Sequence, residues 1–172
     1  MEYNNLTELI GVIAKLRSPE GCPWDRAQTH SSLRSNMLEE AYEAVDAIDD
    51  GDMPHLREEL GDVLLQVLLH SQIASENGDF TIDDVAKELK DKLIHRHPHV
   101  FGNAHLETPD EVKDAWDKLK AEEKIHRKSV MDGISRCQAA LMSAQKISKR
   151  AVKTGFEWPD EDSLYAVSYT HL

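Results

Sequence analysis

The sequence predicts an all-α protein, and three observations lead to this prediction. Apolar residues recur at helical spacing along most of the chain, whereas the alternation typical of strands is hard to find. Glycine and proline are sparse, at 8 and 6 of 172 residues, so helices meet few breaks. The chain is 40% hydrophobic and 30% charged, which allows a buried core and argues against disorder.

The first predicted helix begins at a capping Asn4 or Asn5 and ends before Pro19. Two prolines and a glycine in residues 18–25 prevent a continuous helix there, so we expect a loop. Trp24 lies in this loop, where it covers the core or offers a flat platform to a ligand. Covering the core is the commoner role, because Trp side chains are largely buried on average.

Two helices with a short break between them follow. The second helix starts near a capping Ser31 or Ser32 and stops at Gly51. Its apolar stripe consists of Leu33, Met37, Leu38, Ala41, Val45 and Ile48. The third helix, capped by Asp52 and ending around 77–78, is the most apolar segment. It should be buried on several sides, as the centre of a bundle or against a second subunit.

Three further helices are predicted. The fourth opens at Thr81 with a capping-box-like pattern and ends before Pro98. Its buried side is marked by Val85, Leu89, Leu93 and Ile94. The fifth opens at Thr108, runs to about Lys124 and carries many charges, as is typical of a solvated face. The sixth spans about 139–152.

Two acidic pairs flank the break between the second and third helices. Glu40 and Glu43 are three residues apart, as are Glu59 and Asp62, so each pair shares one helix face. A short connection favours antiparallel neighbours, so the two pairs can face each other. Four converging carboxylates repel, and oxygen-only ligands indicate a hard cation between them, Mg²⁺ or Mn²⁺. Gly61 permits close approach of a helix or ligand, or serves helix packing alone.

The formal net charge of −12 disfavours a nucleic-acid polymer or an anionic membrane as the partner. An anionic small substrate stays compatible, because a bound divalent metal reverses the local sign. The two cysteines, Cys22 and Cys137, form neither a disulfide framework nor a zinc motif and fit a reducing compartment. Membrane-span and signal-peptide patterns are missing, so we expect a cytoplasmic protein.

Four motifs together resemble one family. They are Gly-Cys-Pro-Trp-Asp at 21–25, Glu-Glu-x-x-Glu at 39–43, Glu-x-x-Asp at 59–62 and Arg-His-Pro-His-Val-Phe at 96–101. In this set and order they closely resemble MazG, a family of nucleoside triphosphate pyrophosphohydrolases. The resemblance covers roughly Leu6 to Lys124 and resumes as an incomplete second unit near 141–159.

The resemblance implies an all-α bundle of the MazG type that forms a homodimer. It implies Mg²⁺ dependence, with Mn²⁺ as a substitute, and cleavage of NTPs or dNTPs to the monophosphate and pyrophosphate. The implied metal ligands are Glu40, Glu43, Glu59 and Asp62, with Glu39 as a further ligand or the group that orients or deprotonates water. Metal-activated water is the economical mechanism, because no Ser–His or Cys–His pairing and no phosphate loop stands out.

Basic residues must reach the phosphates, since the overall charge is unfavourable. Candidates for substrate binding are Arg96, Lys118 and Lys120, although each is also compatible with a surface charge. The histidines of segment 95–99 match no standard zinc pattern, so we assign them a loop role or phosphate contact. Trp24 is the candidate for stacking on the base.

Two other classes of protein also present acidic side chains on helices. A di-iron carboxylate bundle needs two Glu-x-x-His pairs, and only the segment from Glu123 to His126 fits. An acidic regulatory or binding module would instead present its carboxylates to a basic partner. Magnesium-dependent release of pyrophosphate would exclude that module as the main function, and iron content with visible absorption would favour the di-iron bundle.

For domain organisation we predict a MazG-like domain over 1–126, a linker over 127–135 and a truncated second MazG-like unit over 136–172. A Gly/Trp/Pro/Asp turn follows the first helix and recurs around Trp158, as a weak internal repeat. The last residues do not resemble the acidic helix that a second unit would carry. We therefore expect a truncated or misread end, with foreign sequence from about Ala166.

Overall fold

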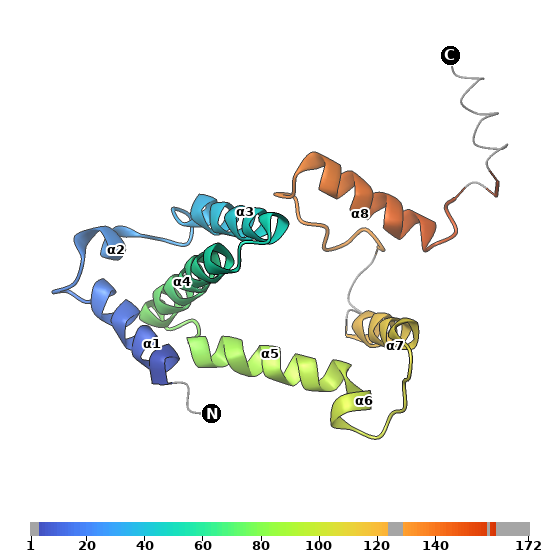
Figure 1. The fold of residues 1–172 in the computed structure, drawn as a ribbon, viewed down its shortest axis with the longest axis horizontal. Coiled ribbons are helices and arrows are strands. Elements are labelled where there is room, and N and C mark those ends of the chain that lie inside the picture. The colour runs from blue at the N-terminus through green and yellow to red at the C-terminus, as the bar shows by residue number, and fades with distance from the viewer. Residues whose placement is uncertain (1–3, 124–128, 158, 161–172) are drawn as a thin grey trace, which may run out of the picture. The chain divides into compact units, whose positions relative to one another are not determined.

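The structure is a computed structural model that describes residues 4–123, 129–157 and 159–160. Every regular element in these ranges is a helix, which confirms the predicted all-α class (Figure 1). The chain packs as two compact units, residues 1–104 and residues 105–172. Among the described helices, none combines the length and the apolar character that a membrane crossing requires.

The first unit is organised around its longest helix, α4. Its helices are α1 (Asn4–Arg17), α2 (Pro23–Ala27), α3 (Arg34–Asp50), α4 (Met53–Asn77), α5 (Ile82–Arg96) and α6 (Pro98–Phe101). α3 and α4 lie side by side as a hairpin, and α1 and α5 also pack against α4 (Figure 1). The most apolar segment of the sequence therefore lies at the centre of this unit, which is one of the two arrangements expected for it.

A two-residue turn makes the α3–α4 hairpin. Gly51 adopts the left-handed conformation with φ of 69°, which favours glycine, and its N–H donates to the carbonyl of Ala47. The N–H of Asp52 donates to the same carbonyl at 3.1 Å. The Asp52 side chain then caps α4 by accepting the N–H of His55 at 3.0 Å. The turn sets the end of α3 beside the start of α4.

The hydrophobic core lies along the C-terminal half of α4. Its buried residues are Ile13, Leu33, Leu68, Leu69 and Ile73. The residues that α3 buries are small, Ala44 and Ala47, at 7% and 0% exposure. Small side chains let two helix backbones approach closely, so acidic side chains on both helices can meet across the hairpin.

The apolar faces predicted for the second and fourth helices are half exposed in this chain. Six of their members have relative exposures between 43% and 56%, whereas the predicted member Leu33 is buried at 1%, and Ala44 and Ala47 occupy the buried face of α3. Helical spacing identifies an apolar face but does not tell which surface covers it. The half-exposed residues are Leu38, Val45 and Ile48 on α3 and Leu89, Leu93 and Ile94 on α5.

Two local predictions were wrong. Trp24 lies in the short helix α2 rather than in an irregular loop, because a proline at the first helical position suits a helix start. α3 begins after Leu33, which provides no side-chain cap. Ser32 instead closes a turn with Thr29: each residue donates its N–H to the hydroxyl of the other, at 2.9 and 3.1 Å.

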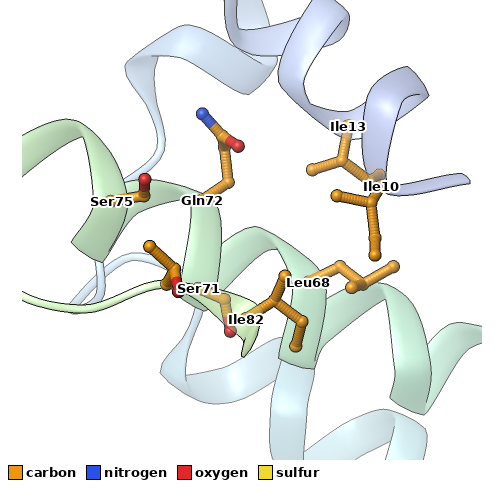
Figure 2. A pocket seen from close by; sticks show the side chains of 8 residues that line it. Ile10, Ile13, Leu68, Ser71, Gln72, Ser75 and Ile82 are labelled. Carbon is orange, nitrogen blue, oxygen red and sulfur yellow. The ribbon is translucent and has the colours of Figure 1, made fainter. Parts of the chain in front are cut away.

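A pocket of about 220 Å³ lies between α1, α4 and the start of α5 (Figure 2). Its lining residues are Ile10, Ile13, Leu68, Ser71, Gln72, Ser75, Thr81 and Ile82. The Ser71 hydroxyl is already used, since it donates to the carbonyl of Val67 at 2.8 Å. None of these lining side chains is ionisable, so the pocket offers no charge to a nucleotide or a metal.

The second unit contains α7 (Pro109–Glu122) and α8 (Ala140–Val152). Lys153, just after α8, forms an ion pair with Asp117 of α7 at 2.5 Å. Arg150 of α8 donates to the carbonyls of Val130 and Asp132 at 2.7 and 2.9 Å and so fixes the turn that these residues form. Polar contacts thus hold α7, the turn and α8 together.

Candidate metal centre

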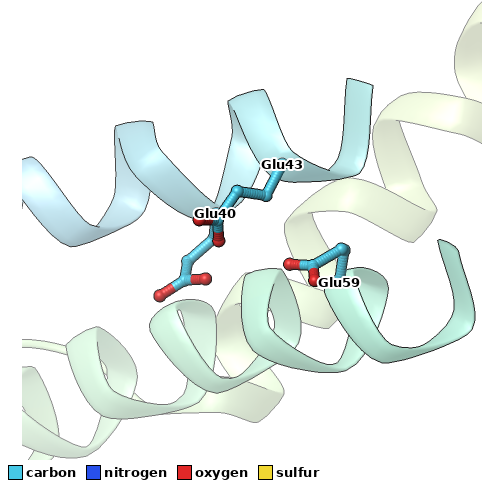
Figure 3. A group of neighbouring side chains, drawn as sticks. All are labelled: Glu40, Glu43 and Glu59. Atoms are coloured by element: carbon cyan, nitrogen blue, oxygen red, sulfur yellow. The ribbon is translucent and has the colours of Figure 1, made fainter. Parts of the chain in front are cut away.

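Three glutamates meet where α3 and α4 lie side by side. Glu40 and Glu43 come from neighbouring turns of α3, and Glu59 faces them from α4 (Figure 3). One carboxylate oxygen of each lies within 4.8 Å of the others. The sequence predicted this meeting, because acidic residues three apart share a helix face and a short turn makes the helices antiparallel.

Glu59 is the buried member of this group, at 7% exposure. Its Oε1 lies 3.0 Å from Nε2 of His55, one turn earlier on α4. Its Oε2 is buried, and no described residue donates a hydrogen bond to it. A buried carboxylate oxygen without a donor is costly, and a cation bound there would remove that cost.

The electrostatics of Glu40 also favour a cation. Burial raises the pKa of its carboxyl, and the negative charge of Asp62 raises it further, followed by those of Glu43, Glu39 and Glu59. Each neighbouring carboxylate disfavours ionisation of Glu40, because like charges repel. A divalent ion bound between these carboxylates would offset their repulsion and favour their ionised forms.

The donor set fits a hard divalent ion such as Mg²⁺ or Mn²⁺. Only carboxylate oxygens take part in the three-glutamate cluster, and oxygen ligands are those that Mg²⁺ prefers. Asp62 is near enough to raise the pKa of Glu40 but lies outside the group of three. Glu39 is exposed beside the cluster, where water can reach it.

Sequence reasoning missed two residues that touch the cluster. His55 pairs with Glu59. The one sequence feature that could have indicated this pair is the i, i+4 spacing of a histidine and a glutamate on one helix. Gln66 donates its Nε2 N–H to Oε1 of Glu40 at 3.4 Å. The sequence feature that could have indicated a special role for Gln66 is that it is the single polar residue within the apolar run from Val63 to Leu69.

Trp24 lies far from the cluster within the same chain. The residue is 60% exposed, so Trp24 does not cover the core of this chain. Arg17 donates to the Asp25 and Gln28 carbonyls at the end of α2 and pairs with Glu76. Glu76 and Glu59 are 17 residues apart on α4, which is about 25 Å at 1.5 Å per residue. The helix that carries Trp24 is thus fastened near the opposite end of α4.

The predicted basic residues are distributed over both units. Arg96 is the last residue of α5 and is half-buried. Lys118 and Lys120 lie on α7 in the second unit, where the Lys120 ammonium is 5.7 Å from the centre of the Trp116 ring. That distance suits a cation–π contact, which gives Lys120 a local partner.

Some predictions fall outside the described residues. They concern His126 of the one Glu-x-x-His segment, the first residues of the predicted linker, Trp158 of the second turn, and residues 161–172, where foreign sequence was expected. The predicted boundaries at 126 and 135 stay a prediction. They describe family units, whereas the division after Ala104 describes how the chain packs.

Comparisons with known proteins place the cluster within a family segment. Residues 28–101 match the MazG nucleotide pyrophosphohydrolase domain. The chain is 48% identical over 159 residues to the nucleoside triphosphate pyrophosphohydrolase/pyrophosphatase MazG of Thermotoga maritima, and 43% identical over 169 residues to the nucleoside triphosphate pyrophosphohydrolase of Escherichia coli. These matches cover 92% and 94% of this chain but 61% and 64% of those proteins.

Two further comparisons bear on the fold and the family. A crystal structure of a MazG-related protein from Thermotoga maritima matches with a TM-score of 0.56 and 25% identity, over 69% of this chain and 98% of that one. A 26.1 kDa protein of Streptomyces cacaoi is 46% identical over 169 residues, which are 97% of this chain and 69% of that protein. By these matches, and with its three glutamates inside the matched segment, the chain belongs to the MazG family.

Proposed function

We propose that this chain hydrolyses nucleoside triphosphates between the α and β phosphates, to the monophosphate and pyrophosphate. The observation that carries the proposal is the cluster of Glu40, Glu43 and Glu59, in which the buried Oε2 of Glu59 has no donor among the described residues. Relatives that bear the name nucleoside triphosphate pyrophosphohydrolase support the reaction class. This chain spans 61% and 64% of their lengths, so the activity is proposed for it.

The metal in this proposal is Mg²⁺, with Mn²⁺ as a substitute. Glu40, Glu43 and Glu59 would hold it, and Asp62 is the fourth proposed ligand. When bound, the ion supplies neutralisation of the phosphate charge and a water of lowered pKa. The donor-free oxygen of Glu59 and the crowding of negative charge around Glu40 support this assignment.

The remaining steps belong to side chains around the cluster. We assign Glu39, which is exposed beside it, to orienting or deprotonating the attacking water. His55 holds Glu59 through Oε1, while Oε2 has no donor among the described residues. Arg96, Lys118 and Lys120 stay predictions for phosphate contacts, and Trp24 stays a prediction for base contact.

A homodimer is also proposed, on the evidence of the half-exposed apolar face of α3. Leu38, Tyr42 and Val45 are each at least half exposed and recur at helical spacing. Contiguous apolar surface of this kind is typical of a protein interface. A second copy of the chain is the proposed partner, because helices that share an apolar face can bury it by symmetric packing. The cytoplasmic location stays a prediction, compatible with Cys22 and Cys137, neither of which forms a disulfide.

The experiment that tests the reaction incubates each NTP and dNTP with and without Mg²⁺ and separates pyrophosphate from orthophosphate. We expect pyrophosphate and the monophosphate in the presence of Mg²⁺ only. Orthophosphate with the diphosphate as products would contradict the site of cleavage. A lack of any turnover would favour the alternative function, an acidic binding module.

Two matched variants locate the activity. Glu43→Gln should abolish turnover, because it removes one charged oxygen ligand while preserving the shape of the side chain. Glu58→Gln removes an exposed carboxylate next to Glu59 and should leave turnover unchanged. Full activity in Glu43→Gln would contradict the proposed site.

A further inference from the structure

Gln66 is a buried polar side chain whose position the proposed reaction does not explain. It interrupts the apolar run from Val63 to Leu69 of α4 and is 4% exposed. Its carbonyl oxygen is buried, and no described residue donates a hydrogen bond to it. Burying an amide with an unmade hydrogen bond costs stability, whereas a leucine or methionine there would cost none.

The position of Gln66 relates it to the three glutamates. It follows Asp62 by four residues and Glu59 by seven, so all three side chains share one face of α4. Its Nε2 is 3.4 Å from Oε1 of Glu40 across the hairpin. The nitrogen must be the atom nearer to Glu40, because an ionised carboxylate only accepts hydrogen bonds.

A second glutamine on the same helix provides a contrast. Gln72 is half-buried and donates to Glu76 at 3.0 Å, away from the cluster. The contact of Gln66 with Glu40 is longer than an ordinary hydrogen bond of about 2.9–3.0 Å. Hydrogen bonds at catalytic sites are often long without ligand and shorten on binding, and the Gln66–Glu40 distance is compatible with that behaviour.

We infer that Gln66 is a positioning residue of the acidic cluster: its amide N–H fixes the Glu40 carboxylate for cation binding. This inference rests on the proposed metal site. Groups that hold a metal-ligating carboxylate in place raise the affinity of the site, because they reduce the reorganisation that binding requires.

If Gln66 has this role, replacing it by an apolar residue should raise the thermal stability of the protein and lower its affinity for the metal. Replacing Gln66 by methionine, which has a similar volume, removes the buried unpaired oxygen and should raise the melting temperature of the metal-free protein by about 2–4 °C. The same replacement should weaken cation binding by about 10-fold, the usual effect of losing a group that orients a ligand. If Gln66 only filled space, its replacement by methionine would not raise the melting temperature while weakening cation binding.

The experiment measures Mn²⁺ binding to the full chain by electron paramagnetic resonance, together with the melting temperature without metal. Gln66→Met should bind Mn²⁺ about 10-fold more weakly than wild type, and Gln72→Met should bind it as wild type does. In a Glu40→Gln background, Gln66→Met should cause no further loss, because Gln66 acts through Glu40.

The outcomes separate this inference from the proposed function. Wild-type binding that Gln66→Met leaves unchanged would overturn the role of Gln66 alone. Equal and additive losses in the wild-type and Glu40→Gln backgrounds would also overturn it, since Gln66 would then act independently of Glu40. Failure of the wild-type chain to bind Mn²⁺ would overturn the proposed metal site and the inference together.

Discussion

Arg17 and Glu76 join the C-terminal ends of α1 and α4 through a bidentate ion pair. Nη2 of Arg17 lies 2.8 Å from Oε2 of Glu76, and its Nε lies 3.0 Å from Oε1. The Arg17 side chain is 6% exposed, and its Nη1 donates to carbonyls at the end of α2. One buried guanidinium therefore ties three helices together, and its removal affects the whole first unit.

Glu76→Gln should lower the free energy of unfolding at neutral pH by about 1.5 kcal/mol, since hydrogen bonds to charged groups contribute about that much. The hydrogen bond from Arg17 is the main cause that holds the pKa of the Glu76 carboxyl below its ordinary value. Such a carboxyl stabilises the fold above its ordinary pKa, and the stabilisation is lost as pH falls through the lowered folded value.

Urea unfolding of wild type and Glu76→Gln over a range of pH tests the predicted direction of this pH dependence. The difference between the two proteins should be greatest at neutral pH and shrink below about pH 4.3, the ordinary carboxyl pKa. A difference that stays constant into acid would mean that the charge of Glu76 contributes nothing to stability.

His30 and His70 form a second pH-dependent pair. His30 lies in the segment that precedes α3, and His70 lies on α4. Their Nδ1 atoms are 2.7 Å apart, the ring planes differ by 1° and the ring centres are 5.0 Å apart. Rings so arranged meet edge to edge, and the two nitrogens share one N–H. Burial lowers the pKa of His70, and His30 lowers it further.

A histidine with a lowered pKa stabilises the fold fully above its ordinary pKa of about 6.5, and this contribution is lost as pH falls through the folded value. His70→Gln keeps a hydrogen-bonding side chain but does not titrate in this range. We expect wild type to lose stability relative to His70→Gln as the pH is lowered from 7 to 5, measured by thermal unfolding. Parallel stability curves for the two proteins would contradict this expectation.

The proposed homodimer makes a prediction about molecular mass. Leu38→Glu places a charge on the half-exposed face of α3 and should convert dimers to monomers in analytical ultracentrifugation, because a buried unpaired charge is costly. Leu141→Glu is the matched control, since Leu141 is 86% exposed on α8. A wild-type protein that sediments as a monomer would contradict the proposed homodimer. A Leu38→Glu variant that remains dimeric would contradict the proposed interface on α3.

Gly61 provides a test of the space beside the acidic residues. A Cβ atom at this position would meet no atom within 4 Å, although close approach or tight packing was expected from the sequence. Gly61→Ala should therefore raise the free energy of unfolding by about 1 kcal/mol, the difference in helix propensity. A loss of stability on chemical denaturation would show that another surface packs against Gly61.

Local signals made most helix boundaries predictable from the sequence. Gly51 and Gly78 adopt left-handed conformations at the ends of α3 and α4, and Thr81 forms the expected capping box with Asp84. These features depend on residues a few positions apart, so the sequence contains the necessary information. The meeting of Glu40 and Glu59 was predictable for the same reason, because only a two-residue turn separates their helices.

Non-local contacts were not predictable in this way. The pairing of Arg17 with Glu76 spans 59 positions, and no local pattern indicates it. The apolar stripe containing Leu38 was recognised as a face, but helical periodicity does not specify which surface covers that face. The contact between Gln66 and Glu40 depends on the rotation of α4 against α3, which small residues such as Ala44 determine through packing.

The most direct test of the central claim measures pyrophosphate release from NTPs as Mg²⁺ is titrated into wild type and Glu59→Gln. The account predicts saturable, Mg²⁺-dependent release by wild type and a loss of about 100-fold or more in Glu59→Gln, because the buried carboxylate oxygen without a donor becomes an uncharged amide. Release that does not depend on Mg²⁺, or that Glu59→Gln retains in full, would contradict the claim that this cluster is the catalytic metal centre.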